Sequence, residues 1–472
     1  MSFSSLGLCD ELLKAVAEQG YTTPSPIQIN AIPLVLSGRD VMAVAHTGTG
    51  KTAGFTLPML QLLSDGAIQD RTIHQGTALE ETFNEKTVKG RLSSQAKCVR
   101  ALVITPTREL AAQVASSVQN YSQHMNIRSA AVFGGVRIEP QIAQLQGGLD
   151  VLVATPGRLI DLYNQQAIKF DHLEILVLDE ADRMLDLGFV DDIRHIQTLL
   201  PTQRQTLMFS ATFSKEIKTL AKGMLNNPHL IEVSDARSTV DSVKQKIYSV
   251  DKELKSQVLI HLIKNNKWRQ VLVFCRTKHG ADDLVLQLEK AGIHAASIHA
   301  NRTQHARTHA LEGFKNGNVV VLVATDIASR GIDVNQLPCV VNFDLPYVPE
   351  DYIHRIGRTG RAGTSGLGIS LFSEDESKQL QSIERLIDRK FEREIIPGFA
   401  PSKKALAGSS NDGKNGKNGK NGKNGGRNNG KNNEKEDNKE NEENEENDVY
   451  GNFEADPKPQ LQSKGRGRRR GK

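Results

Sequence analysis

Short runs of apolar residues without alternating polar positions recur through most of this chain. Such runs are typical of β-strands buried on both faces, as in parallel sheets. Stretches with helical spacing separate them, which predicts an α/β fold. The first set of runs is VMAV (41–44), ALVIT (101–105), SAAVF (129–133), VLVAT (151–155), ILVLD (175–179) and TLMFS (206–210). The second set is QVLVFC (270–275), AASI (295–298), VVVLVAT (319–325), CVVNF (339–343) and LGISLF (367–372).

One pentapeptide, VLVAT, occurs once in each set and ends at Thr155 and at Thr325. A match of five residues can arise by chance, but with two sets of strands around it a duplicated domain is the better interpretation. Open α/β sheets bind ligands beyond the carboxyl ends of their strands, where both threonines are expected. We therefore predict two tandem parallel-sheet domains, at 1–233 and 243–398, joined by a short polar linker at 234–242.

Two segments are rich in polar residues and poor in apolar ones, a composition typical of segments outside packed cores. Residues 64–98 are polar and predict a surface insertion in the first domain. Residues 399–472 hold GKN triplets, an acidic block and a basic end, with too few apolar residues to offset chain entropy, so they predict a disordered tail. The net charge of +5 resides in that tail, and the rest of the chain is neutral. Any nucleic acid bound by the domains must therefore be held by a local track of donors.

Cysteine spacing and hydropathy exclude several classes of protein. The four cysteines are scattered without a CxxC pair, which argues against zinc and against a disulfide framework. Reduced cysteines are usual in the cytoplasm, the compartment we expect. The N-terminal residues lack the pattern of a signal peptide. No apolar run approaches the roughly 18 residues that a membrane helix needs, so we expect no membrane partner.

A glycine-rich segment, AHTGTGKT, begins at Ala45. Gly48 and Gly50 would let backbone amides turn toward phosphate oxygens. Lys51 would reach the outer phosphates, and the hydroxyl of Thr52 suits Mg²⁺. The generic motif has glycine where this chain has Ala45, so the segment alone is also compatible with a turn beside a surface lysine.

An acidic motif elsewhere in the chain favours the phosphate-binding interpretation. The run ILVLD places Asp179 at the end of a buried strand, and Glu180 follows it directly. A lone carboxylate there often only caps a helix, but two adjacent ones are more specific. In a nucleotide hydrolysis site, Asp179 would hold the metal ion and Glu180 would orient and deprotonate the attacking water.

A basic segment in the second domain, HRIGRTGR (354–361), would supply the positive charge that phosphoryl transfer needs. Arg358 and Arg361 are three residues apart, a spacing that places them on one face of a helical turn. A solvated basic stretch is the ordinary alternative. If these arginines instead reach across a cleft to the departing phosphate, hydrolysis depends on closure of the two domains.

Ten ordered motifs resemble those of the DEAD-box RNA helicases, and within that family the bacterial RhlE type. The motifs are GYTTPSPIQ (20–28), AHTGTGKT (45–52), PTRELA (106–111), GG (134–135), TPGR (155–158), DEAD (179–182), SAT (210–212), VFCRT (273–277), ATDIASRGID (324–333) and HRIGRTGR (354–361). The resemblance implies two RecA-like domains, ATP and Mg²⁺ as cofactors, and RNA-stimulated ATP hydrolysis. It further implies sequence-independent binding to the RNA backbone and local unwinding of short duplexes by an ATP-driven clamp.

The resemblance also assigns residues to sites. It implies that the first domain binds ATP and has its Q motif at residues 1–28. The implied ATP-binding residues are Phe3, Gln28, Ala45, His46, Thr47, Gly48, Thr49, Gly50, Lys51, Thr52, Gly331 and Asp333. The implied catalytic residues are Lys51, Asp179, Glu180, Arg358 and Arg361, with Thr52 and Asp179 on Mg²⁺. The residues expected to couple ATP to RNA are Asp182, Ser210, Thr212 and His354. The expected RNA path is Arg108, Gly135, Thr155, Gly157, Arg158, Arg276 and Thr325.

The assignments of Phe3 and His354 each have an ordinary structural alternative. Gln28 would read adenine through its amide, and Phe3 would lie on the adenine ring. A single Phe near an N-terminus is otherwise usually a core residue, and a histidine such as His354 is otherwise usually structural.

Cellular setting and function class are expectations of the same kind. Ribosome assembly or RNA decay would fit, with proteins of those processes as possible partners. The basic end of the tail would tether RNA electrostatically, unless the tail serves only solubility. Two rivals stay open: an RNA-binding or annealing factor without turnover, and a DNA translocase built on the same paired domains. The intact Lys51, Glu180, Arg358 and Arg361 argue against the first, and Gln28 with the DEAD tetrapeptide argues against the second.

Overall fold

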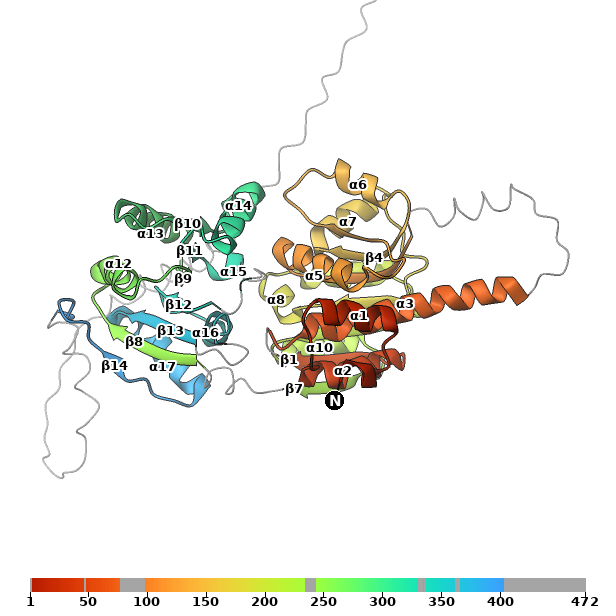
Figure 1. Ribbon diagram of the computed structural model, residues 1–472, viewed down its shortest axis with the longest axis horizontal. Helices are drawn as coiled ribbons and strands as arrows, with labels where there is room; N and C mark the ends of the chain where they lie inside the picture. The colour runs from red at the N-terminus through yellow and green to blue at the C-terminus, as the bar shows by residue number, and fades with distance from the viewer. Residues whose placement is uncertain are drawn as a thin grey trace, which may run out of the picture. The chain divides into compact units, whose positions relative to one another are not determined.

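Two seven-stranded sheets form the framework of the protein (Figure 1). The structure is a computed structural model that describes residues 2–45, 48–76, 98–233, 243–329, 334, 337–360 and 366–402. The strand orders are β3-β4-β2-β5-β6-β1-β7 and β10-β11-β9-β12-β13-β8-β14, and the paired strands in both sheets are parallel. The predicted α/β fold with two parallel sheets is confirmed. The predicted linker and nearly all of the predicted tail lie outside the described residues.

The first sheet is built between residues 41 and 233. Its strands are β1 (Val41–Ala45), β2 (Val99–Ile104), β3 (Ser129–Val132), β4 (Leu149–Ala154), β5 (Ile175–Leu178), β6 (Gln205–Ser210) and β7 (His229–Val233). Its helices are η1 (Phe3–Leu6), α1 (Asp10–Glu18), α2 (Pro26–Leu36), α3 (Lys51–Gly76), α5 (Arg108–Tyr121), α6 (Glu139–Leu145), α7 (Pro156–Asn164), α8 (Ala181–Asp186), α9 (Val190–Leu199) and α10 (Lys215–Met224).

The second sheet is built between residues 243 and 394. Its strands are β8 (Val243–Ser249), β9 (Val271–Phe274), β10 (Ala295–Ile298), β11 (Val321–Ala324), β12 (Cys339–Asn342), β13 (Gly366–Phe372) and β14 (Arg393–Glu394). Its helices are η2 (Lys252–Leu254), α12 (Lys255–Asn266), α13 (Lys278–Lys290), α14 (Gln304–Lys315), α15 (Asp326–Ser329), α16 (Pro349–Ile356), η3 (Glu374–Glu376) and α17 (Ser377–Ile387).

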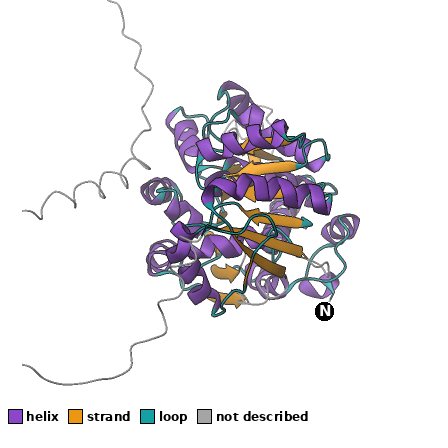
Figure 2. Ribbon diagram, turned by 90° about the vertical axis from the view of Figure 1, so that its left-hand side faces the viewer, coloured by secondary structure: helices purple, strands orange, loops and turns teal. Residues whose placement is uncertain are grey.

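Each sheet has helices packed on both of its faces, and Figure 2 shows helices on either side of the strands that face the viewer. Successive side chains of a strand point to opposite faces, and the cores follow this rule. Val177 packs in the core cluster that contains α2, α3 and α5, whereas its neighbours Leu176 and Leu178 pack in the cluster that contains α7, α9 and α10. Central strands therefore need apolar residues at every position, which explains the unalternating runs.

The two sheets have equivalent strand orders when they are aligned by position. The repeated pentapeptide VLVAT supplies β4 and β11, and each is the second strand in its sheet. The strand before the phosphate loop, β1, corresponds to β8, and β5 before the acidic pair corresponds to β12. This correspondence supports duplication of a domain. It also places Thr155 and Thr325 at equivalent carboxyl ends.

The structure departs from the sequence-based expectation at the sheet edges. Strands β7, β8 and β14 are not among the predicted runs, because they lie at or next to the edge and contain many polar residues, β14 being only Arg393–Glu394. Residues 64–76 of the predicted insertion continue helix α3, and the surface position of the insertion stays a prediction. The rest of the insertion, apart from Cys98, lies outside the described residues.

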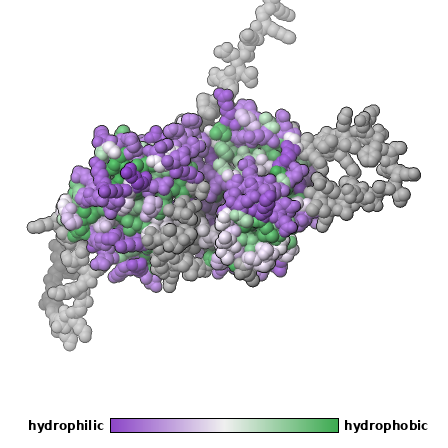
Figure 3. Space-filling model, in the orientation of Figure 1, coloured by the Kyte–Doolittle hydropathy of each residue, from purple (hydrophilic) through white to green (hydrophobic). Residues whose placement is uncertain are grey.

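The surface of the described residues is mainly hydrophilic on the face seen in Figure 3, with apolar positions in small separate patches. The exposed large apolar side chains include Tyr347 and Leu286, at 66% and 59% exposure. Within the part of the chain that the structure describes, no helix is both long enough and apolar enough to cross a membrane.

A buried ion pair stabilises the second sheet beneath its carboxyl edge. The ammonium of Lys255, which is 1% exposed, lies 2.6 Å from one carboxylate oxygen of Glu376 and donates to the carbonyl of Phe343. The other oxygen of Glu376 accepts from Arg276 at 2.7 Å and from the amide of Leu345 at 2.9 Å. Glu376 therefore joins α12, the loop after β9 and the loop after β12.

We expect Lys255→Met to lower the free energy of unfolding by about 3 kcal/mol, because the buried carboxylate of Glu376 loses the more deeply buried of its two cations and keeps only Arg276. Denaturant unfolding monitored by circular dichroism measures the change. Lys252→Met is the matched control, since Lys252 pairs with Asp375 at 3.3 Å on the surface, with 66% of its side chain exposed. Equal stability losses for the two variants would contradict the role given to the buried pair.

Candidate functional site

The phosphate-binding segment lies where the sequence predicts it, between β1 and α3 (Figure 1). Gly48 and Gly50 have φ values of 81° and 94°, a left-handed conformation that favours glycine. Helix α3 begins at Lys51, so its free N-terminal amides face the loop. His46 and Thr47 lie outside the described residues.

Gln28 connects the Q motif to this loop. Its side chain is 4% exposed, its amide nitrogen donates to the carbonyl of Gly50 at 3.1 Å, and its amide oxygen accepts from the backbone nitrogen of Ser25 at 2.8 Å. A Cβ atom on Gly50 would collide with the Gln28 amide, which makes glycine necessary at that position. Phe3 is 5% exposed and belongs to the core cluster of the first domain, so its contact with adenine stays a prediction.

The lysine and the aspartate predicted to meet phosphate and metal are both buried. Lys51 is 6% exposed and Asp179 is 2% exposed. Among the described atoms, neither the Nζ of Lys51 nor the Oδ1 of Asp179 has a hydrogen-bond partner. Burial raises the pKa of Asp179 to about 7, although the nearby ammonium of Lys51 acts to lower it. Buried polar atoms without partners are unfavourable, so their persistence in one place fits a site prepared for a charged ligand.

Glu180 has an unusual backbone conformation. It lies just before α8 with φ 55° and ψ 53°, a left-handed geometry that is rare outside glycine and asparagine. Such a conformation costs on the order of 1–3 kcal/mol and persists where the surrounding structure enforces it. The resulting turn places Glu180 among the residues that line a pocket.

The residues predicted to couple ATP to RNA are partly brought together. Asp182 accepts from the backbone nitrogen of Ala211 at 3.1 Å, and the hydroxyl of Ser210 accepts from the backbone nitrogen of Thr212 at 3.3 Å. The second carboxylate oxygen of Asp182 is buried without a described partner. His354, from α16, lines the same pocket as Asp182.

That pocket draws on both sheets. Glu180 and Asp182 follow β5 of the first sheet, whereas His354 lies on α16 and Arg358 lies two residues after α16, beside the second sheet. Arg358 is 8% exposed. Besides His46 and Thr47, the predicted site residues Gly331, Asp333 and Arg361 lie outside the described residues, and the roles of all five stay predictions.

The predicted RNA path in the first domain follows the ends of β2, β3 and β4. A Cβ atom on Gly135, which has φ 75°, would overlap the guanidinium of Arg108, so these two motifs are in direct contact. Arg158 donates to the carbonyl of Val136 at 3.0 Å. Gly157 has no other atoms within 4 Å of a Cβ position, so its surface is open. The three loops therefore form one continuous edge.

In the second domain, Arg276 is already engaged by protein groups. Its guanidinium pairs with Glu376 at 2.7 Å and stacks over the ring of Tyr347 at 4.6 Å. Thr325 lies at the end of β11, where its backbone nitrogen donates to the carbonyl of Ile298 at 3.2 Å. Both residues lie at the carboxyl edge of the second sheet, and contact with RNA stays a prediction for each.

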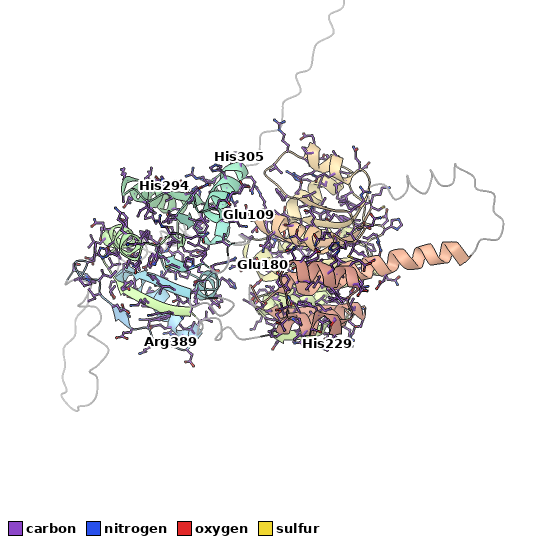
Figure 4. All side chains as sticks on the ribbon, in the orientation of Figure 1. Glu109, Glu180, His229, His294, His305 and Arg389 are labelled. Atoms are coloured by element: carbon purple, nitrogen blue, oxygen red, sulfur yellow. The ribbon has the colours of Figure 1, made fainter. Side chains whose placement is uncertain are left out.

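Several residues of this region were not predicted from the sequence. Glu109, next to Arg108, pairs with Arg307 of α14 at 2.9 Å. Figure 4 shows Glu109 and Glu180 on the same side of the first sheet, where its strands end. Arg355 forms a two-pronged ion pair with Asp326, both contacts at 2.6 Å. The sequence offered one signal for them, because both residues lie inside the quoted motifs, Glu109 in PTRELA and Arg355 in HRIGRTGR.

Arg183, directly after the DEAD tetrapeptide, was also missed. Its guanidinium donates to Asp351 of α16 at 2.8 Å and lies 2.6 Å from the Nδ1 of His354. Burial acts to lower the pKa of Arg183, but the carboxylate of Asp351 outweighs it and the pKa is raised. The side chain is therefore a permanent cation between two helices.

A phosphate loop and an acidic pair on one parallel sheet, beside a second sheet with arginines, define a nucleotide-hydrolysing enzyme with two like domains. A family model for the DEAD/DEAH box helicase domain matches residues 25–220, and one for the helicase conserved C-terminal domain matches residues 254–363. The chain belongs to the DEAD-box ATP-dependent RNA helicases.

Individual relatives agree with this family. ATP-dependent RNA helicase RhlB from Pseudomonas syringae pv. tomato is 38% identical over 398 residues, which are 84% of this chain and 95% of the relative. RNA helicase CrhR from Synechocystis sp. is 40% identical over 397 residues, with 84% and 75% covered. Among solved structures, S. cerevisiae Dbp5 bound to RNA and ADP BeF3 has a TM-score of 0.70 at 30% identity, with 84% of this chain and 95% of that chain covered.

Family membership confirms two RecA-like domains and an enzyme that hydrolyses ATP. The narrower RhlE type stays a prediction, because these relatives carry other names.

The raised pKa of Asp179 yields a test in the absence of nucleotide. The folded state binds this proton more tightly than the unfolded state, so ionised Asp179 reduces stability as pH rises from about 4 to about 7. Asp179→Asn removes that cost. We expect its Tm at pH 8 to exceed that of the wild type by a few °C, since about 1 kcal/mol shifts Tm by about 2–4 °C in domains of this size.

The gain should shrink at pH 5, and ATP hydrolysis should be lost. Thermal unfolding at both pH values measures the effect. Asp191→Asn, at a side chain 95% exposed, serves as the control and should leave Tm unchanged. A Tm at pH 8 equal to or below that of the wild type would contradict the cost assigned to the buried charge.

Proposed function

We propose that this helicase works as an ATP-driven clamp that binds the RNA backbone without sequence preference and separates short duplexes locally. The observation that carries the proposal is the pocket to which both domains contribute, with Glu180 and Asp182 from one and His354 and Arg358 from the other. Because the predicted base and the predicted arginine belong to different domains, hydrolysis requires both domains at one nucleotide.

The buried charges support the binding of ATP with Mg²⁺. Lys51 would hold the outer phosphates, and the hydroxyl of Thr52 with the carboxylate of Asp179 would hold Mg²⁺. The unpartnered Nζ of Lys51 and Oδ1 of Asp179 fit these roles, since each lacks a described protein partner. Bound Mg²⁺ would neutralise charge that develops on the phosphates.

The remaining residues divide the chemistry between the domains. Glu180 takes the proton of the attacking water, and a positioned base of this kind contributes typically about 10²–10⁴ in rate. Arg358, together with Arg361, stabilises negative charge in the transition state from the second domain. Gln28 recognises the adenine edge while it contacts the phosphate loop through Gly50.

The RNA track is proposed along the carboxyl edges of the two sheets. Arg108, Gly135 and Arg158 form a continuous edge on the first domain, where guanidinium and backbone groups suit phosphate and sugar. The ion pair of Glu109 with Arg307 and the hydrogen bond of Glu109 with Gln304 extend this edge toward α14 of the second domain. The likeness to Dbp5 bound to RNA and ADP BeF3 supports such a track.

Differential affinity of ATP for the closed arrangement would drive the cycle. Closure joins both halves of the track, and a strand held there in bent form cannot remain paired. Loss of phosphate after hydrolysis reopens the clamp. Ribosome assembly or RNA decay in the cytoplasm is the proposed setting, and the four free cysteines are compatible with a reducing compartment.

The enzymatic part of the proposal is tested with Glu180→Gln. We expect ATP and RNA to bind as in the wild type, while RNA-stimulated ATP hydrolysis falls by about 10²-fold or more, because the variant keeps the shape but loses the base. Steady-state ATPase with RNA, with DNA of the same sequence and with a non-nucleic polyanion measures turnover and selectivity. Stimulation by DNA equal to that by RNA would favour a DNA translocase, and no stimulated turnover in the wild type would favour a factor that only binds RNA.

Clamp closure is tested by energy transfer between dyes on the two domains. Leu230→Cys on β7 and Leu286→Cys on α13 provide exposed positions, at 45% and 59% exposure, in a Cys9→Ser background. We expect transfer efficiency to change when RNA and a non-hydrolysable ATP analogue are added together, and to change little with either alone. Full ATPase activity with unchanged transfer would refute the clamp.

A further inference from the structure

The side chain of Arg183 joins the helix of the DEAD motif to the helix of His354. Arg183 lies on α8, and 7% of its side chain is exposed. One terminal nitrogen, Nη1, donates to Asp186 of the same helix at 2.9 Å. The other, Nη2, donates to Oδ1 of Asp351 at 2.8 Å and lies 2.6 Å from Nδ1 of His354. The two hydrogens of Nη2 thus have two acceptors on α16.

This contact determines where His354 carries its proton. A guanidinium has donors but no acceptor. The Nδ1 atom of His354 must therefore accept, and a neutral imidazole that accepts at Nδ1 carries its hydrogen on Nε2. Asp351 strengthens the arrangement, because its side chain is only 8% exposed and holds the same guanidinium nitrogen.

An acceptor suited to that hydrogen lies in the same pocket. Asp182 and His354 both line it. One oxygen of Asp182 is held by the backbone nitrogen of Ala211, and the other, Oδ1, is buried with no described hydrogen-bond partner. The Nε2–H form of His354 can donate to such an oxygen. The opposite tautomer would present a lone pair to a carboxylate, which is repulsive.

We propose that Arg183 is a positioning residue that fixes the Nε2–H tautomer of His354, so that His354 can bond to Asp182 when both domains engage their ligands. The inference rests on the proposed function in one respect, the coupling role of Asp182 and His354. Arg183 touches neither phosphate nor RNA in this scheme. It acts by setting the donor that the second domain offers to the first.

The first experiment compares steady-state ATPase of the full-length chain with Arg183→Met and Arg183→Lys. We expect Arg183→Met to lower kcat of RNA-stimulated hydrolysis by about tenfold or more, equivalent to about 1.4 kcal/mol. The KM for ATP should change less than kcat, because the first domain keeps its phosphate loop. Lysine retains one charged donor, so Arg183→Lys should recover part of the loss.

Two matched controls separate this role from a general loss of charge. Asp186→Asn removes the partner of Arg183 within its own helix and leaves the contacts with α16 in place. Arg194→Met deletes an exposed arginine that pairs with Asp191 at 3.4 Å on α9. Both should retain RNA-stimulated kcat within about twofold. If either loses as much as Arg183→Met, the proposal is overturned.

The second experiment reads the tautomer directly and does not depend on turnover. Nitrogen-15 spectra of selectively labelled histidine distinguish protonated from unprotonated ring nitrogens, and His354→Gln identifies the signal of His354. We expect unprotonated Nδ1 and protonated Nε2 in the wild type, and loss of this single form in Arg183→Met. A protonated Nδ1 in the wild type, or the same form in both proteins, would overturn the inference. Failure of the proposed function would be recognised by a different result, namely a wild-type protein whose ATPase activity is not stimulated by RNA.

Discussion

Charge buried at the end of a parallel sheet is the constraint from which the rest of the site follows. Lys51 and Asp179 lie within the protein with polar atoms that no described protein group satisfies, and burial raises the pKa of the aspartate. Packing alone would not retain these side chains. The glycines of the loop, the turn at Glu180 and the arginines of the second domain are understandable as the surroundings of a ligand that bears both phosphate and metal charge.

The two domains share one strand order, which fits duplication, but they carry different side chains at the ends of equivalent strands. The strand order repeats, yet β5 is followed by Asp179 and Glu180, whereas β12 is followed by Phe343 and Asp344. Asp344 serves structure, since it accepts from the backbone of Arg276 and lies 3.7 Å from Lys255. In the proposed site, the first copy supplies the carboxylates together with Lys51, and the second copy supplies Arg358 and Arg361. Neither copy alone contains a complete site.

The sequence was most informative where a local pattern has one physical cause. Central strands need apolar residues on both faces, so β5 and β11 were predictable from their runs. Edge strands such as β7 face solvent, and their mixed pattern is shared with loops and helices. Arg183 and Asp351 were missed because 168 positions separate them, and no local pattern reports a contact formed by the fold. The left-handed turn of Glu180 was missed because its residue type does not favour that conformation.

The hydrogen bond from Gln28 to the carbonyl of Gly50 has a consequence for nucleotide choice. The side chain proposed to read the adenine base also supports the loop proposed to hold the triphosphate. A purine base that cannot pair with the Gln28 amide, such as guanine, would therefore disturb the loop around the phosphates of the same nucleotide. In this arrangement, an incorrect nucleoside triphosphate would bind more weakly, and its scissile bond would also be misaligned. Any that does bind would therefore be hydrolysed slowly.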